Sequence, residues 1–261
     1  MFHEIEHYYG SHVHLLNSPL LHGLLADLCA SETVQPRINQ LVTDLYERLL
    51  DYVVDREFSV GPFSSSTRMT ERHPEARVLG TRVLPQQRVI CVDVARAGII
   101  PSAVCYTNLH KYLQPDLIRQ DHIFSSRTTG VDDEHVVGSE ISACKIGGPK
   151  DGALLLIPDP MGATGNTVMA TLEHYKQHVS GKWQKVLALH LIVTPEYLRA
   201  VQKAHPDLII YAIRLDRGLS PQAVLNTTPG LHWDQEKGLN DADYIVPGGG
   251  GFGEIMNNSF C

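Results

Sequence analysis

The stretch that decides the fold reads Leu154-Leu155-Leu156-Ile157-Pro158-Asp159-Pro160-Met161-Gly162-Ala163-Thr164-Gly165-Asn166-Thr167-Val168. Its four leading apolar residues predict a buried strand, and the pattern that begins at Thr167 predicts a helix. Between the two lies a turn of small residues that opens with an acid, Asp159. A buried strand that passes through a short turn into a helix is the unit from which parallel α/β sheets are built.

The turn has the chemistry of a phosphate site. Small residues let backbone N–H groups approach an anion, and the first N–H groups of a helix lie at the positive end of its dipole without partners inside the helix. Thr164 and Thr167 add hydroxyl donors, and Asp159 can accept hydrogen bonds from ribose hydroxyls. A tight turn would by itself explain Gly162 and Gly165, so the turn alone leaves both interpretations open.

Strands and helices alternate on both sides of this unit. Continuous apolar strands between helices predict an α/β fold with a mostly parallel sheet covered by helices on both faces. Pro195, preceded by Thr194, marks one helix start clearly. A polar segment at 59–75 predicts an exposed loop or hairpin. The predicted strands are 89–94, 117–124, 154–157, 186–193 and 208–213, and the predicted helices are 36–52, 99–113, 167–179 and 195–204.

Composition excludes several classes of protein. The chain has 261 residues, enough for one large domain, and a net charge of −7, which disfavours a nucleic-acid partner. No apolar run approaches the ~20 residues of a spanning helix, so no membrane association is expected. Five scattered cysteines without a Cys-x-x-Cys pair predict a reducing, cytoplasmic location.

The first sixteen residues carry four of the fourteen histidines, His3, His7, His12 and His14. Their spacing fits no metal-ligand pattern on a clear helix or strand, so no protein metal site is predicted. We expect residues 1–16 to form a polar, partly mobile tail.

Four segments, in order, resemble the uracil phosphoribosyltransferase family. Asp159–Thr167 resembles the family's D-P-M-x-A-T-G-G-S loop for ribose 5-phosphate, and Ala95–Ile99 resembles its L-R-A-G-L turn. Ser126-Arg127 lies where the family has an arginine before a hairpin, and Tyr244–Gly248 resembles its Y-I-V-P-G segment. The resemblance runs from about Asn17 to the C-terminus.

This resemblance implies a type I phosphoribosyltransferase (Rossmann-like) fold in a single domain, 1–261. Residues 17–58 would form an N-terminal arm and helix, and residues 241–261 would form the base-binding loop of a C-terminal hood. Residues 220–240 stand as an insertion where a short connection is usual. The family also implies a homodimer or higher homo-oligomer.

The implied reaction transfers the phosphoribosyl group of phosphoribosyl diphosphate (PRPP) to uracil and gives UMP and diphosphate. Mg²⁺ would be bound mainly through the substrate diphosphate, because it sheds water reluctantly. By resemblance Arg96, Arg127 and Asp159 are the catalytic residues. They also bind PRPP together with Pro160, Met161, Gly162, Ala163, Thr164, Gly165, Asn166 and Thr167, and the base is bound by Tyr244, Ile245, Gly250, Gly251 and Phe252.

One position departs from the family pattern. Gly251 stands where the family has an aspartate near the base and the Mg-diphosphate, and Glu254 is the nearest carboxylate that could replace it. The departure leaves two alternatives open: a phosphoribosyltransferase for a different base, or a catalytically weak protein that senses a nucleotide.

Overall fold

The computed structural model describes residues 3–129 and 136–259. Its centre is a nine-stranded sheet within those ranges. The inner strands β2, β11, β10, β8, β5 and β6 run parallel, and the outer strands β1 and β7 run antiparallel to their neighbours. In spatial order the strands are β1 (His3–Glu4), β2 (Val13–Asn17), β11 (Leu208–Leu215), β10 (Lys185–Val193), β8 (Leu154–Pro158), β5 (Val89–Ala95), β6 (Ile118–Thr129) and β7 (Val136–Lys145), with β9 (Met161–Gly162) beside β10.

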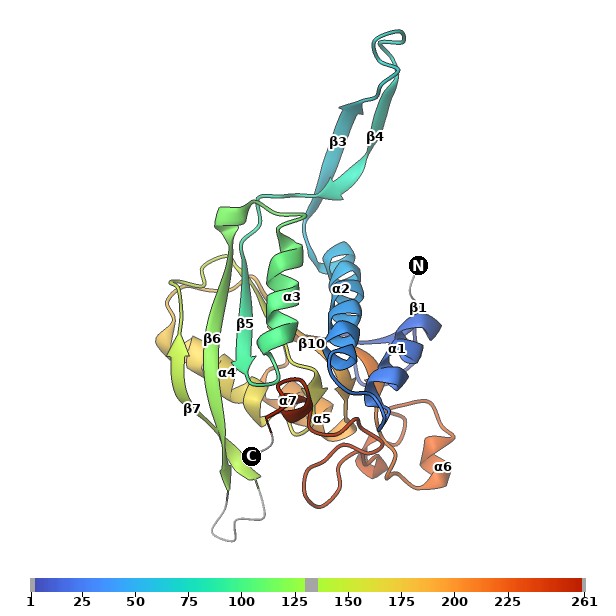
Figure 1. Cartoon of the computed structure of the whole chain (residues 1–261), viewed down its shortest axis with the longest axis vertical. Coiled ribbons are helices and arrows are strands. Elements are labelled where there is room, and N and C mark those ends of the chain that lie inside the picture. The colour runs from blue at the N-terminus through green and yellow to red at the C-terminus, as the bar shows by residue number, and fades with distance from the viewer. Residues whose placement is uncertain (1–2, 130–135, 260–261) are drawn as a thin grey trace.

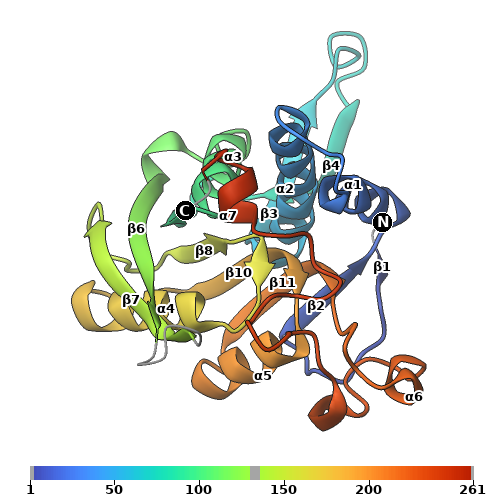
Figure 2. The ribbon, with the colours of Figure 1, turned by 60° about the horizontal axis from the view of Figure 1, so that its bottom comes forward.

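Helices cover both faces of this sheet (Figure 2). Side chains alternate along each strand, so Val89 and Cys91 join one core while Ile90 and Val92 join the other. The first core lies under α1 (Pro19–Cys29), α2 (Arg37–Glu57) and α3 (Ile99–Leu109), and the second under α4 (Asn166–His178) and α5 (Pro195–Ala204). The predicted α/β class is confirmed. Among the described residues, no helix has the length and apolar character needed to cross a membrane.

The predicted elements are present with shifted ends. Helix α2 continues past Tyr52 to Glu57, because Val53 and Val54 extend its buried face. Helix α3 ends at Leu109 rather than at 113, and the chain there turns into the short 3-10 helix Pro115–Leu117.

Strands β3 (Val60–Ser66) and β4 (Arg77–Val83) form a separate antiparallel hairpin that projects far beyond the rest of the molecule (Figure 1). The predicted exposed hairpin at 59–75 is therefore confirmed, and it is longer than the prediction. Its surface carries exposed apolar side chains, including Val60, Val78 and Leu79.

The N-terminal residues contradict the predicted tail. Residues 13–17 form β2, which pairs in parallel with β11, and Val13 and Leu15 are buried. The ring of His14 stacks on Tyr211 at 4.5 Å between centroids, and its Nδ1 lies 3.1 Å from a carboxylate oxygen of Glu4. The segment is therefore part of the sheet. The prediction failed because a short parallel strand is defined by its pairing with a neighbour, which the sequence pattern alone does not show.

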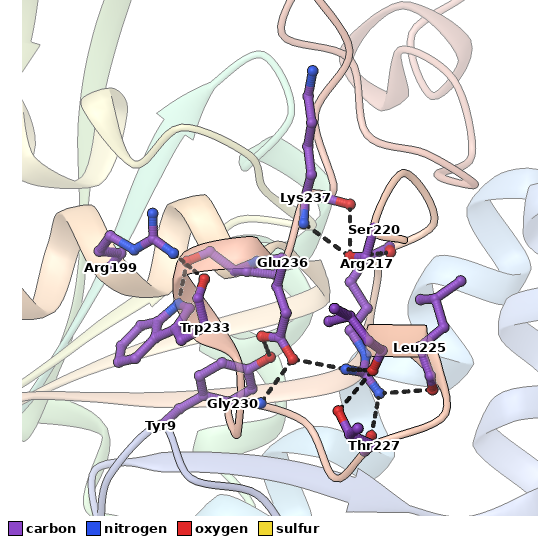
Figure 3. Close-up of polar contacts among 12 residues, drawn as sticks. Tyr9, Arg199, Arg217, Ser220, Leu225, Thr227, Gly230, Trp233, Glu236 and Lys237 are labelled. Carbon is purple, nitrogen blue, oxygen red and sulfur yellow. Dashed lines mark hydrogen bonds and ion pairs between the residues drawn. The ribbon is translucent and has the colours of Figure 1, made fainter. Parts of the chain in front are cut away.

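Residues 220–240 follow β11 and contain the short helix α6 (Gln222–Leu225). Their anchor is a buried ion pair of 2.7 Å between Arg217 and Glu236 (Figure 3). Glu236 also accepts hydrogen bonds from the Gly230 N–H and the Tyr9 hydroxyl. Residues 220–240 are thus tied both to the residues that follow β11 and to the N-terminal segment.

Candidate active site

Most of the predicted site residues meet at a cavity of about 710 Å³, within the usual size of small-molecule sites. It lies outside the carboxyl ends of β5 and β8, where open α/β sheets bind ligands. The wall is formed by the turn after β5, the phosphate loop Asp159–Thr167 and the base loop Tyr244–Glu254. Its lining residues include Arg96, Asp159, Met161, Ala163, Thr164, Gly165, Thr167, Tyr197, Tyr244, Ile245, Gly250, Gly251, Phe252 and Glu254.

The phosphate loop is held mainly by the backbone of the sheet. The N–H of Asp159 donates to the carbonyl of Leu189 at 3.0 Å, and the carbonyl of Pro160 accepts from Leu191 and Ile192. Further along the loop, the N–H of Thr194 donates to the carbonyl of Gly162 at 3.0 Å. The loop then enters α4, so the positive end of that helix faces the cavity.

The two loop glycines are required by packing. A Cβ on Gly162 would lie 2.9 Å from a methyl of Val193, and a Cβ on Gly165 would lie 2.8 Å from a methyl of Val201. Gly165 also has a φ of +88°, which side chains disfavour. Close packing therefore accounts for these glycines, and the phosphate interpretation depends on the cavity and its other residues.

A buried histidine stabilises this loop from behind, and the sequence analysis missed it. The His190 Nδ1 lies 2.5 Å from the Asp159 carbonyl oxygen, and its Nε2 lies 2.6 Å from the Tyr197 hydroxyl. Burial lowers the pKa of His190 to about 4, so the ring is neutral. A neutral ring fits one arrangement, in which Nδ1–H donates to the carbonyl and Nε2 accepts from Tyr197. Only its place in the middle of an apolar strand could have indicated this role.

Arg96 lies in the turn between β5 and α3. Gly98 lets this turn pack closely, because a Cβ there would lie 2.7 Å from the Val94 nitrogen and 3.3 Å from the Pro158 carbonyl oxygen. The Arg96 guanidinium contacts Glu254 at 3.3 Å and donates to the backbone and hydroxyl oxygens of Ser259 at 3.1 and 3.0 Å. About a third of its side chain is exposed. The C-terminal segment therefore covers the arginine that faces the cavity.

The base loop is held by two side chains at the end of β11 and by backbone hydrogen bonds at Val246. The N–H of Gly248 donates to Asp216 Oδ2 at 2.7 Å, and its carbonyl accepts from Arg214 at the same distance. Arg214 and Asp216 form a two-point ion pair of 2.6 and 2.8 Å, in which Asp216 is 1% exposed. Within the loop, Ile245 and Phe252 are buried and Tyr244 is 54% exposed.

Most of the predicted site residues line the cavity, and three do not. Pro160 and Gly162 are buried in the loop's packing, and Asn166 lies at the start of α4 without lining the cavity. The backbone of Arg127 belongs to β6 and pairs with Ser139, while its side chain lies outside the described part of the structure. The hairpin predicted after Arg127 includes the acidic residues Asp132, Asp133 and Glu134, which also fall outside the described residues.

The described residues contain no group of three or more His, Cys, Asp or Glu that could hold a metal ion. The carboxylates of Asp159 and Glu254 line the cavity from opposite loops. This donor set fits a Mg²⁺ ion that keeps most of its ligands as water and phosphate oxygens.

Comparisons with known proteins agree with this geometry. Residues 15–232 match the family described as Uracil phosphoribosyltransferase. A uracil phosphoribosyltransferase of Macrococcus caseolyticus is 25% identical over 254 residues, which cover 94% of this chain and 97% of the relative. One from Symbiobacterium thermophilum is 28% identical over 231 residues, covering 85% and 94%.

Among solved structures, the AQ2163 protein from Aquifex aeolicus has a TM-score of 0.68 at 20% identity and covers 94% of this chain and 97% of its own. This likeness shows the shared fold. The matched family spans most of the chain and includes the turn after β5 and the phosphate loop, while the base loop follows the matched residues. The chain belongs to the uracil phosphoribosyltransferase family.

Proposed function

We propose that this protein is a uracil phosphoribosyltransferase, which transfers the phosphoribosyl group of PRPP to uracil and releases diphosphate. The observation that carries the proposal is one cavity lined by three kinds of group. A helix N-terminus with Thr164 suits a phosphate, Asp159 suits ribose hydroxyls, and the base loop Tyr244–Glu254 suits a planar ring. The named relatives support uracil as the base.

Each loop would bind one part of the nucleotide. The loop Asp159–Thr167 would bind the 5′-phosphate with N–H groups and hydroxyls, while the Asp159 carboxylate accepts hydrogen bonds from the ribose. Ile245 and the backbone of Gly250–Phe252 would bind the edge of the base. A buried Ile245 and Phe252 give this end an apolar floor, which a pyrimidine ring needs.

Arg96 would bind the leaving diphosphate, with Arg127 as its second arginine. Charge grows on the diphosphate as its bond to the anomeric carbon breaks, and planar guanidinium groups stabilise that charge. In the structure Arg96 contacts Glu254 and Ser259, so the diphosphate would replace these partners. No covalent intermediate with the protein is needed, because positioning and electrostatic stabilisation suffice.

Mg²⁺ is the cofactor that this proposal includes. Bound to the diphosphate oxygens, it would neutralise the charge of the leaving group. The protein's own part would be to place the carboxylate of Asp159 within reach of the ion's water shell.

We further propose a cytoplasmic homodimer or higher homo-oligomer. The support is the projecting β3–β4 hairpin, where Val60, Val78 and Leu79 are 54%, 50% and 75% exposed. Exposed apolar side chains on a projecting hairpin favour burial against another subunit. Light scattering after gel filtration tests this: a monomer at all concentrations would contradict it.

The direct test of function is diphosphate release from PRPP with Mg²⁺ and a panel of free bases. We expect release that requires uracil and yields UMP. Diphosphate release only with another base would show that uracil is not the substrate. Binding of UMP without any release would show that the protein is a nucleotide sensor and not an enzyme.

A further inference from the structure

Glu254 occupies the space that a side chain at position 251 would fill. An ideal Cβ on Gly251 would lie 2.1 Å from Glu254 Oε2 and 3.1 Å from its carboxyl carbon. The Gly251 backbone is ordinary extended chain, with φ −82° and ψ 92°, which any residue adopts. Two other glycines of the loop, Gly248 and Gly250, have positive φ and differ in this respect. Glycine at 251 is therefore explained by the room that the Glu254 carboxylate needs.

The two oxygens of this carboxylate have different surroundings. Oε1 contacts the Arg96 guanidinium at 3.3 Å, whereas Oε2 accepts no hydrogen bond from the described residues and lies above Gly251. Both Gly251 and Glu254 line the cavity, and the Glu254 side chain is 37% exposed. One oxygen thus neutralises the arginine while the other remains available to a ligand beside the base loop.

We propose that the Glu254 carboxylate accepts the proton from the reacting ring N–H of the base. Gly251 makes this position of the carboxylate possible. The inference rests on the proposed function. As the new bond forms between the ring nitrogen and the anomeric carbon, the N–H proton passes to the Glu254 carboxylate. The bond from the anomeric carbon to the diphosphate oxygen breaks, and its electron pair leaves with the diphosphate. Occupation of Arg96 by that diphosphate frees Glu254 Oε1 as well.

The geometry allows a sharp test, because the carboxylate can be moved from position 254 to position 251. Glu254→Gln should lower kcat/KM for uracil by about 10- to 100-fold, the usual effect of a lost acid–base group or charged hydrogen bond. It should leave the KM for PRPP nearly unchanged. The double variant Gly251→Asp with Glu254→Ala should recover most of the wild-type kcat/KM, because the new side chain starts where the old carboxylate ended.

Two further variants separate chemistry from folding. Gly251→Ala keeps the carboxylate but displaces it, and should lower kcat/KM for uracil while the melting temperature stays close to wild type. Glu75→Gln makes the same chemical change on an exposed residue of the projecting hairpin and should change neither quantity. A more acidic base, 5-fluorouracil, should be less sensitive to Glu254→Gln than uracil is, because it needs less help to lose its proton.

The outcomes distinguish this inference from the proposed function. A wild-type protein that makes no UMP would overturn the function itself. A wild type that makes UMP, with Glu254→Gln equal to it in kcat/KM for uracil, would overturn only the role of Glu254. A loss confined to the KM for PRPP would also overturn that role, since it would show that the carboxylate acts only through Arg96.

Discussion

The two loops that form the cavity are built in different ways. The phosphate loop Asp159–Thr167 takes its shape from backbone hydrogen bonds to β10 and from the close packing of two glycines. The base loop Tyr244–Glu254 takes its shape from the buried pair Arg214–Asp216, which binds Gly248, and from backbone hydrogen bonds to segments outside the sheet. If each loop binds as proposed, the ribose phosphate would depend on the main chain of the sheet, while the base would depend on a loop that is held in part by side chains.

The base loop is also supported by backbone contacts near both ends of residues 220–240. The Val246 carbonyl accepts from the Gly218 N–H at 3.0 Å, and the Val246 N–H donates to the Gly238 carbonyl at 2.8 Å. Gly218 directly follows Arg217 and Gly238 lies two residues after Glu236, and Figure 3 shows the ion pair between Arg217 and Glu236. We infer that residues 220–240 act as a brace for the base loop.

The largest expected effect is on that brace. Glu236→Gln leaves the Arg217 charge buried without its partner, so we expect the free energy of unfolding to fall by about 3–5 kcal/mol. Urea unfolding measures it. The exposed Lys237–Asp241 pair provides the control, and Asp241→Asn should leave the unfolding midpoint unchanged. A loss no larger than that of the control would contradict the brace.

The next effect is on the phosphate loop. Asp159→Asn keeps the shape of the side chain but removes its charge, so we expect kcat/KM for PRPP to fall roughly 100-fold, or about 2.7 kcal/mol. Steady-state kinetics with saturating uracil measures this fall. The exposed Asp116→Asn is the matched control and should retain wild-type activity. Equal activity of the two variants would remove Asp159 from the mechanism.

A third prediction concerns pH. The folded-state pKa of His190 is about 4, below its ordinary value of 6.5. Its contribution to stability is therefore fully present above pH 6.5 and is lost as the pH falls toward 4, at up to about 1.4 kcal/mol per pH unit. Unfolding measured at several pH values should show a shallower fall for His190→Gln than for the wild type. Parallel curves would show that His190 does not titrate in this way.

The smallest expected effect is at one hydroxyl. Thr164→Val removes a donor that lines the cavity, so the KM for PRPP should rise about threefold to tenfold, the value of one hydrogen bond. Thr164→Ser retains the hydroxyl and should stay within about twofold of the wild type. If Val and Ser behave alike, the phosphate does not contact this side chain.

The sequence predicted one loop better than the other for a physical reason. The phosphate loop is local: its strand, small residues and helix are contiguous, and all of them lie where the pattern indicated. The base loop depends on Arg214, Asp216 and Glu254, whose roles arise from contacts between segments that are distant in sequence. The family resemblance predicted Tyr244, Ile245 and Phe252, but no local pattern predicts the distant residues that hold the loop in place.

The same reason explains the two main misses. His190 lies in an apolar strand, and its role follows only from the Asp159 carbonyl and Tyr197 that the fold brings to it. The strand Val13–Asn17 is too short to be predicted by itself and is defined by its pairing with β11. Local patterns predicted the layers of the fold, whereas the edge of the sheet and the interior polar contacts required the tertiary structure.

The central claim is that one nucleotide contacts both loops at once, and hydrogen exchange of the wild-type chain with and without UMP tests it most directly. We predict slower amide exchange in 160–169 and also in 244–255 when UMP is bound, with the larger change in the base loop, whose free form lacks the support of the sheet. Protection of the phosphate loop alone, or of neither loop, would contradict the account.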